Sequence, residues 1–220
     1  IAETMIVERD ARLALETGCA VHIQHVTSEG SLSIIEKTKA QGARFTAELT
    51  PHHLALCDDD ILRDDANFKM NPPLGTTADC EALAAALADG TITCLATDHA
   101  PHTAAKKSMG LAESAFGIIG LETAAAITYD LLVKSGRITL ARWVALWTTA
   151  PAKIIGIPTP SLTPGVPANL SVFKTGVTKV LSQTDILSKS ANTPFLGRSV
   201  YLDPILTFCD GRISWDSSDG

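Results

Sequence analysis

The apolar residues of this chain follow a helical spacing in some stretches and form short continuous runs in others. The helical spacing predicts helices at residues 2–16, 31–41, 79–88, 121–134 and 140–148. The short apolar runs predict strands at residues 20–26, 43–49 and 91–97. Because helices separate the strands, we expect the strands to pair in parallel, which defines an α/β architecture.

Histidine and aspartate residues gather where the three predicted strands end. All six histidines lie within residues 22–102; His25 ends the first strand, His52-His53 follows the second, and Asp98 ends the third. The catalytic rim of a (β/α)8 barrel is built from such strand ends. Ligands also bind at the carboxyl ends of strands in a doubly wound sheet, so this pattern alone leaves both folds open.

The pattern changes beyond about residue 150, where prolines and glycines recur and break any long helix. Short strand patterns follow at residues 169–173, 200–202, 205–209 and 212–215. Asp210-Gly211, between the last two, is a hairpin turn signal. We therefore predict an α/β part at residues 1–157 and a small β unit at residues 158–220. Since three strands cannot close a barrel, the rest of a barrel would lie upstream of Ile1.

Composition and charge argue against several classes of protein. The formal net charge of −6 opposes binding to nucleic acid, which requires clustered Lys and Arg. No apolar run approaches the roughly 20 residues of a membrane-spanning helix. The cysteines are scattered, odd in number and without a CxxC pair, which favours a reducing, cytoplasmic location over a disulfide framework.

Asp98-His99-Ala100-Pro101-His102 is the strongest local signal for chemistry. It places a carboxylate at the end of an apolar strand and two imidazoles in the following turn, so acid–base groups concentrate on one rim. The competing interpretation is an aspartate that caps the next turn beside solvated histidines.

The first strand offers two histidines, and alternation along a strand puts His22 and His25 on opposite sides. Both therefore cannot bind one metal from a regular strand. We expect His25, at the end of the strand, to be the metal ligand and His22 to pack against a helix.

Two loops supply further candidates. His52 and His53 can chelate a metal or contact substrate, although adjacent histidines in a loop more often hold its structure through hydrogen bonds; Glu48 is a candidate to orient them. The prolines of Asn71-Pro72-Pro73-Leu74 fix the backbone and present the Asn71 amide as a donor and acceptor, or as a simple turn residue. No nucleotide-binding glycine loop and no Gly-x-Ser-x-Gly elbow are present in the sequence.

Taken in order, these motifs resemble those of the class I dihydroorotases, members of the amidohydrolase superfamily. The segments that carry the resemblance are His25-Val26-Thr27, Thr50-Pro51-His52-His53-Leu54, Asn71-Pro72-Pro73-Leu74, Thr97-Asp98-His99-Ala100-Pro101-His102, Phe116-Gly117-Ile118, Gly120-Leu121-Glu122-Thr123, Ser188-Lys189-Ser190, and Asn192-Thr193-Pro194-Phe195 with Gly197. They cover essentially the whole chain. The Asp-His-Ala-Pro-His run is the most specific, because hydantoinases and allantoinases share the fold but differ after the Asp-His.

The resemblance implies the C-terminal part of a TIM-type (β/α)8 barrel, about strands 6–8, followed by part of a small β-sandwich. It also implies a dihydroorotase, which catalyses the zinc-dependent, reversible cyclisation of N-carbamoyl-L-aspartate to dihydroorotate in pyrimidine biosynthesis. The implied partners are this small-molecule substrate and either a second copy in a homodimer or aspartate transcarbamoylase.

The same resemblance assigns roles to individual residues. His25 and Asp98 would bind zinc, one or two ions per site, and Asp98 would also transfer the proton. Asn71, His102 and the backbone of Phe116-Gly117 would bind the substrate. Most metal ligands, including a His-x-His on the first strand of the barrel, are expected upstream of this chain.

Two departures from the family pattern are visible, and two other functions stay open. Gly75 stands where an Arg commonly follows the Leu, and Asn169 replaces the usual Asp of Ala-Asp-Leu. One alternative is a non-catalytic, dihydroorotase-like scaffold subunit of aspartate transcarbamoylase, which would usually have lost metal ligands. The other is a different cyclic amidase, such as a hydantoinase or an allantoinase.

We predict that the 220 residues expressed by themselves are inactive, because an open wedge of three strands exposes apolar edges and lacks most of the metal ligands. The measurement is hydrolysis of dihydroorotate with and without added zinc. Zinc-dependent turnover by this chain alone would contradict the prediction.

Overall fold

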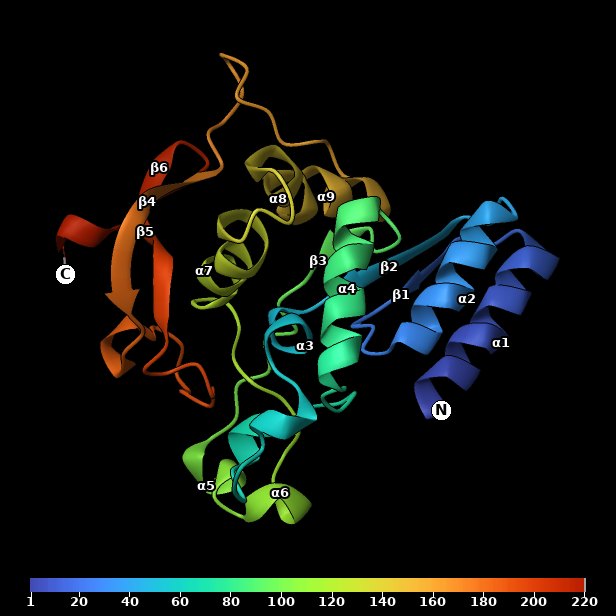
Figure 1. The fold of residues 1–220 in the computed structure, drawn as a ribbon. Helices are drawn as coiled ribbons and strands as arrows, with labels where there is room; N and C mark the ends of the chain where they lie inside the picture. Colours follow the sequence, from blue (N-terminus) through green and yellow to red (C-terminus); the bar gives the residue numbers. More distant parts are fainter. Residues whose placement is uncertain (220) are drawn as a thin grey trace.

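The computed structural model describes residues 1–219 as an α/β wedge followed by an antiparallel sheet, with the two termini at opposite ends of the molecule (Figure 1). The elements of the wedge are α1 (Ala2–Thr17), β1 (Val21–Ile23), α2 (Glu29–Ala40), β2 (Phe45–Leu49), α3 (Pro51–Ala55), η1 (Asp58–Asp60), η2 (Ala66–Phe68), α4 (Thr77–Asp89), β3 (Cys94–Leu95), α5 (Ala104–Lys107), α6 (Gly110–Glu113), α7 (Ala124–Thr128), η3 (Tyr129–Lys134), α8 (Leu140–Trp147) and α9 (Thr149–Ile155). The remaining elements are β4 (Leu170–Val180), η4 (Gln183–Asp185), β5 (Ser199–Cys209), β6 (Arg212–Asp216) and η5 (Ser217–Asp219).

The three strands of the wedge form one parallel sheet in the order β1-β2-β3. Val21 is paired with Phe45, and Glu48 with Cys94. The parallel pairing predicted from the alternation of strands and helices is therefore confirmed, and the carboxyl ends of all three strands meet at one edge.

The two faces of β2 have different environments. Phe45, Ala47 and Leu49 are buried in the hydrophobic core, on the side where α2 packs against β2 and α4 packs against α2 (Figure 1). Thr46 and Glu48 point to the opposite face, because side chains alternate along a strand. One face of the sheet is thus covered by helices, and the other carries polar side chains.

Several boundaries differ from the sequence-based prediction. β1 ends at Ile23 because the chain leaves the extended conformation at His25, whose φ is 40°. The segment after β2, predicted to be a loop, forms the short helix α3, with Pro51 in its first turn. Beyond residue 148 the chain forms one further short helix, α9, which contains Pro151 in its first turn, where no backbone N–H is needed.

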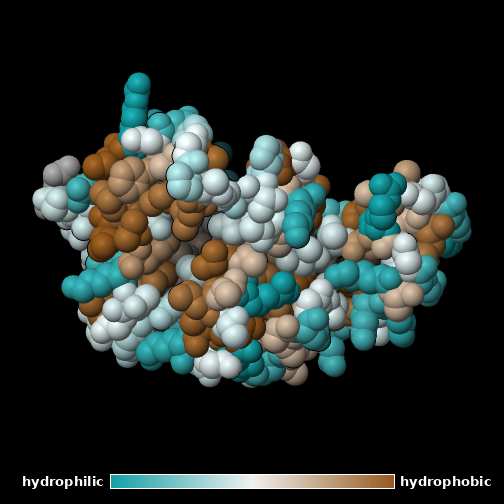
Figure 2. Space-filling view, turned by 90° about the horizontal axis from the view of Figure 1, so that it is seen from above, coloured by the Kyte–Doolittle hydropathy of each residue, from teal (hydrophilic) through white to brown (hydrophobic). Residues whose placement is uncertain are grey.

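The second sheet has the order β4-β5-β6 with antiparallel pairing. Two strands were predicted where the structure has the single strand β5. Pro204 lies next to a register shift and outside the stretch of β5 that pairs with β6, so its missing N–H is tolerated. β4 lies largely exposed, and Figure 2 shows hydrophobic side chains gathered toward the β4–β6 end of the molecule. The predicted boundary at residue 157 falls between α9 and β4 and stays a prediction.

Thr128 ties α7 to α8. Its side-chain oxygen accepts hydrogen bonds from the indole N–H groups of Trp143, at 3.0 Å, and Trp147, at 3.2 Å. Its hydroxyl donates to the carbonyl of Ala124 at 2.8 Å. Thr128 is fully buried, and its single oxygen satisfies the indole N–H of the buried Trp143 and that of the partly buried Trp147.

None of the helices within residues 1–219 has the length and apolar character required to cross a membrane.

Replacing Thr128 by Val keeps the volume but leaves both indole N–H groups without an acceptor. We expect the free energy of unfolding to fall by about 2 kcal/mol, since an unsatisfied buried donor costs about 1–3 kcal/mol. Urea denaturation measures the change. Ser135→Ala is the matched control, because Ser135 makes a similar bond to the Leu131 carbonyl at an exposed position; equal losses in the two variants would refute the role of Thr128.

Candidate active site at the strand ends

His25 and Asp98 follow the ends of β1 and β3, and both have a left-handed backbone, with φ of 40° and 46°. Non-glycine residues rarely adopt this conformation, and where they do so they often cluster at functional sites. The positive φ turns each residue out of the regular alternation of its strand. The predicted pair therefore stands at one rim of the sheet.

His52, in α3, completes this group. Its Nε2 atom lies 3.9 Å from Oδ2 of Asp98. Both Nε2 of His52 and Nδ1 of His25 are buried and have no hydrogen-bond partner within residues 1–219. Buried polar atoms normally have a partner, so two such nitrogens next to one carboxylate indicate a site completed by something else.

Burial raises the pKa of Asp98, and the nearby Glu48 adds to this effect, whereas His25 opposes it. Burial also lowers the pKa of His52 well below its ordinary value, with further contributions from His53 and His25. The rim thus combines a carboxyl that binds a proton more readily than usual with a neutral imidazole. This combination suits general acid–base chemistry near neutral pH.

The donor atoms at this rim fit a zinc ion in part. An imidazole nitrogen from His25 and a carboxylate oxygen from Asp98 are common zinc ligands, and the unpartnered Nδ1 of His25 is free to act as one. These two residues supply two of the usual four ligands. Whether they bind metal stays a prediction.

His53 supports the loop that carries Asn71. Its Nδ1 lies 2.7 Å from Oγ1 of Thr50, and its Nε2 donates to the Pro72 carbonyl at 2.9 Å. The peptide bond between Asn71 and Pro72 is cis. Asn71 and His25 line the same open hollow. Of the two adjacent histidines, one faces the rim and the other holds loop structure, as the hydrogen-bonding interpretation of loop histidines suggested.

The other predicted substrate residues form a second group beside the rim. Nε2 of His102 donates to the Phe116 carbonyl at 2.7 Å. Gly117 has φ of 118°, and a Cβ atom there would lie 2.4 Å from the Cβ of Ala100. Only glycine fits this close approach, which explains the Phe-Gly sequence. The amide of Gly117 donates to the Lys69 carbonyl, two residues before Asn71.

Lys107 and Asn192 hold this second group from either side. The Lys107 ammonium donates to the carbonyls of Lys69 and Gly117, and burial lowers the pKa of Lys107 to about 8. The Asn192 side chain accepts from the amide of His102 and donates to the carbonyl of Gly117. Asn192 was visible in the sequence only as part of a motif, because its contacts are distant in the chain.

Two other predictions about this rim need correction. His22 does not pack against a helix: its ring bonds to Thr46 and Glu48 on the opposite face of the sheet. Glu48 accordingly partners His22 rather than His52 or His53. At His99, Nδ1 is occupied because it accepts from the backbone amide of Gly120.

Solved structures with the same fold are known. The fold is that of the cyclic-amide hydrolases with a TIM barrel. Dihydropyrimidinase from Brevibacillus agri NCHU1002 superposes with a TM-score of 0.90 at 22% identity, over 96% of this chain and 48% of that one. L-hydantoinase from Arthrobacter aurescens superposes with a TM-score of 0.88 at 26% identity, over 97% and 48% of the two chains.

Sequence comparison identifies the family of this chain. The profile of the amidohydrolase family matches residues 3–214, and the chain belongs to this family. A dihydroorotase from Geobacillus thermodenitrificans (strain NG80-2) is 44% identical over 216 residues, and one from Bacillus anthracis (strain A0248) is 43% identical over 215 residues. Both alignments cover 98% of this chain and 50% of the relative. The chain thus spans about half the length of these relatives, and the expected C-terminal part of a barrel is confirmed.

The pKa of His53 predicts an acid-sensitive fold. Burial lowers this pKa from 6.5 to about 4, so the ring is neutral in the folded state. As the pH falls, the unfolded state takes up the proton at a higher pH than the folded state does. Stability from this residue is complete above pH 6.5 and is lost as the pH falls toward 4. Since one pKa unit corresponds to about 1.4 kcal/mol, the loss is about 3 kcal/mol. Urea denaturation of the parent and of His53→Gln between pH 7 and 4 measures it; an unchanged pH dependence in the variant would exclude His53 as the cause.

Proposed function

We propose that this chain is the C-terminal part of a class I dihydroorotase, which interconverts N-carbamoyl-L-aspartate and dihydroorotate with zinc. The observation that carries the proposal is the rim itself. A partly buried carboxyl, Asp98, stands beside two imidazoles with unpartnered nitrogens, and the loops of Asn71 and His102 lie next to it. The dihydroorotases that align with the whole chain at 43–44% identity support the choice of substrate.

In this mechanism His25 and Asp98 contribute to holding zinc, which would activate the amide carbonyl and the attacking water as a Lewis acid. Asp98 takes the proton from the water during ring opening and delivers it to the leaving ring nitrogen. In ring closure it moves the proton in the reverse direction. The raised pKa of Asp98 suits this role, because a carboxyl that gains and loses a proton in one cycle works best with a pKa nearer to the working pH.

The remaining residues bind and orient the substrate. The Asn71 amide offers one donor and one acceptor to the cyclic amide, which carries both groups. His102 would contact the substrate carboxylate, and its bond to the Phe116 carbonyl fixes the ring in one orientation. His52 is a positioning residue: its neutral ring limits the space around the Asp98 carboxylate, with Nε2 3.9 Å from Oδ2.

We further propose a cytoplasmic location and assembly as a homodimer or with aspartate transcarbamoylase. The scattered free cysteines support the first. An enzyme of this family acts on a small molecule, and the antiparallel sheet with its exposed β4 leaves surface for a protein partner.

The test uses the full-length protein in which this chain occurs, with zinc bound. We expect it to hydrolyse dihydroorotate, and Asp98→Asn to lower kcat by about 10²–10⁴-fold, the usual contribution of general acid–base catalysis. Asp59→Asn, an exposed aspartate of η1, is the matched control and should leave kcat unchanged.

Three results would contradict this function. A protein that hydrolyses hydantoin or dihydrouracil in preference to dihydroorotate would be a different cyclic amidase. A protein without activity on any of these substrates, but able to bind aspartate transcarbamoylase, would be a scaffold. Full activity in Asp98→Asn would remove Asp98 from catalysis.

A further inference from the structure

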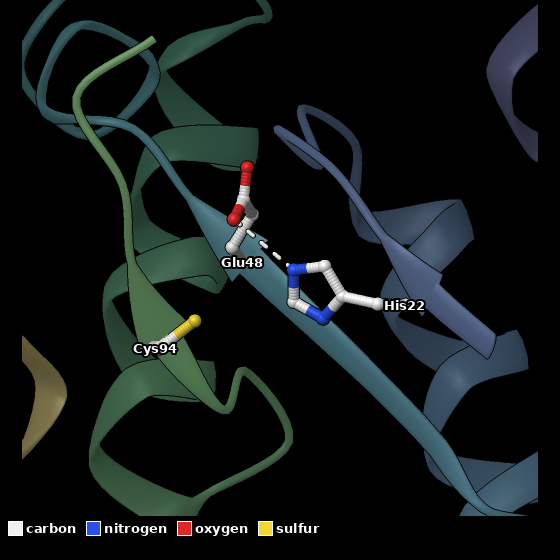
Figure 3. A group of neighbouring side chains, drawn as sticks. All are labelled: His22, Glu48 and Cys94. Carbon is white, nitrogen blue, oxygen red and sulfur yellow. Dashed lines mark hydrogen bonds and ion pairs between the residues drawn. The ribbon is translucent and has the colours of Figure 1, made fainter. Parts of the chain in front are cut away.

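A second cluster of metal-ligating side chains lies on the polar face of the parallel sheet, below the rim. It consists of His22 on β1, Glu48 on β2 and Cys94 on β3, one residue from each strand. Figure 3 shows the His22 ring and the Glu48 carboxylate directed toward each other, with the Cys94 sulfur on the neighbouring strand pointing to the same space. His22 precedes His25 by three residues and Cys94 precedes Asp98 by four, so these two side chains lie below the rim. Glu48 lies closest to the rim, because its carbonyl accepts from the amide of Val26 and its carboxylate raises the pKa of Asp98.

The spacing of the three side chains suits one ion. Nε2 of His22 lies 3.0 Å from Oε2 of Glu48, and these atoms and the Cys94 sulfur all lie within 4.8 Å of one another. Zinc bonds of about 2.0–2.3 Å separate neighbouring ligand atoms by roughly 3–4 Å. Small rotations of the side chains are enough to reach this geometry, because the strand register already aligns Glu48 with Cys94.

The His22 ring is held by a partner on its other side, as in established metal sites. Its Nδ1 lies 2.8 Å from Oγ1 of Thr46, and the Thr46 hydroxyl lies within 3.5 Å of the Val21 carbonyl. When the hydroxyl donates to that carbonyl, it accepts from Nδ1–H and leaves Nε2 as the lone-pair donor. A hydrogen bond of this kind orients metal-bound histidines and fixes their tautomer.

The mixture of donor atoms decides which cation fits. A nitrogen, a carboxylate oxygen and a sulfur together favour zinc and related transition metals over Mg²⁺ or Ca²⁺, which prefer oxygen alone. Cys94 is a free, buried thiol, and burial raises its pKa to about 12. It is therefore protonated at neutral pH without a cation, and a bound transition metal would displace the proton.

The other group of metal-ligating side chains in residues 1–219 is less suited to bind an ion. Cys57, Asp58 and Asp59 are consecutive residues, and both aspartates are exposed. The cluster on the sheet instead draws its three side chains from three paired strands, which hold them more rigidly than a loop does.

We propose that His22, Glu48 and Cys94 bind one divalent transition-metal ion of the zinc type on the polar face of the sheet. Three protein ligands leave a fourth position for water or for a side chain from elsewhere in the protein. The ion would link β1, β2 and β3 below the rim. This inference stands apart from the proposed function, because it uses none of the residues assigned to catalysis.

Cobalt(II) provides the test, since a thiolate bound to Co²⁺ gives a charge-transfer band in the near ultraviolet that nitrogen and oxygen ligands do not. The full-length protein is stripped of metal with a chelator and titrated with Co²⁺. We expect this band in the parent and its loss in Cys94→Ser. Cys80→Ser, at a partly buried thiol outside the cluster, is the control and should keep the band.

Two more variants separate this site from the rim and from a folding defect. Asp98→Asn should keep the charge-transfer band, because Asp98 lies outside the cluster. Thr46→Val should keep the band but weaken Co²⁺ binding about 10–100-fold, the usual effect of removing the partner of a metal-bound histidine. A parent protein without the band, a Cys94→Ser variant that retains it, or loss of the band in Asp98→Asn would each overturn the proposal.

Discussion

The hydrogen bonding of β2 to both of its neighbours is the interaction on which this molecule depends. It sets β1 and β3 parallel to β2, so the chain turns out of all three strands at the same edge. Residues far apart in sequence, His25, His52 and Asp98, reach one rim for this reason alone. The same pairing fixes the two faces of the sheet: one carries the apolar side chains that anchor the helices, and the other carries a polar row. The proposed catalytic residues therefore stand at the edge where the strands end, while the apolar face of the same sheet supplies the packing that stabilises the fold.

The sequence was sufficient for the architecture but not for the orientation of individual side chains. The regular alternation of apolar runs and helical stretches gave the parallel sheet, and Asp98 and His25 stand at the strand ends as predicted. His22 was misplaced because a sequence shows only that it lies opposite His25. Which of the two faces is covered by helices depends on packing, and the helices cover the face of Phe45. α3 was missed because five residues are too few to show a helical period.

Long-range hydrogen bonds could not be predicted from the sequence either. Asn192 contacts His102 and Gly117 across 90 and 75 positions, and no local pattern encodes such pairs. β5 was split in two for a related reason: proline normally ends a strand, and the register shift that accommodates Pro204 becomes visible only when β4 is in place. Local propensity thus failed where a neighbouring element compensates for an unfavourable residue.

The Asn192 side chain gives the order in which the structure can form. The segments around His102 and Gly117 already contact each other through the bond from His102 to the Phe116 carbonyl, but the bonds that join both segments to the Asn192 side chain form only after residue 192 has been synthesised. During translation these two segments leave the ribosome 90 and 75 residues before Asn192, at roughly 5–20 residues per second. Closing a loop of this length costs somewhat more entropy than closing a short one, so this contact forms later than the local contacts. The parallel sheet and its helices, whose contacts are more local, can fold first. The surface proposed to bind substrate then gains its last contacts from residue 192, after the parallel sheet and its helices have formed.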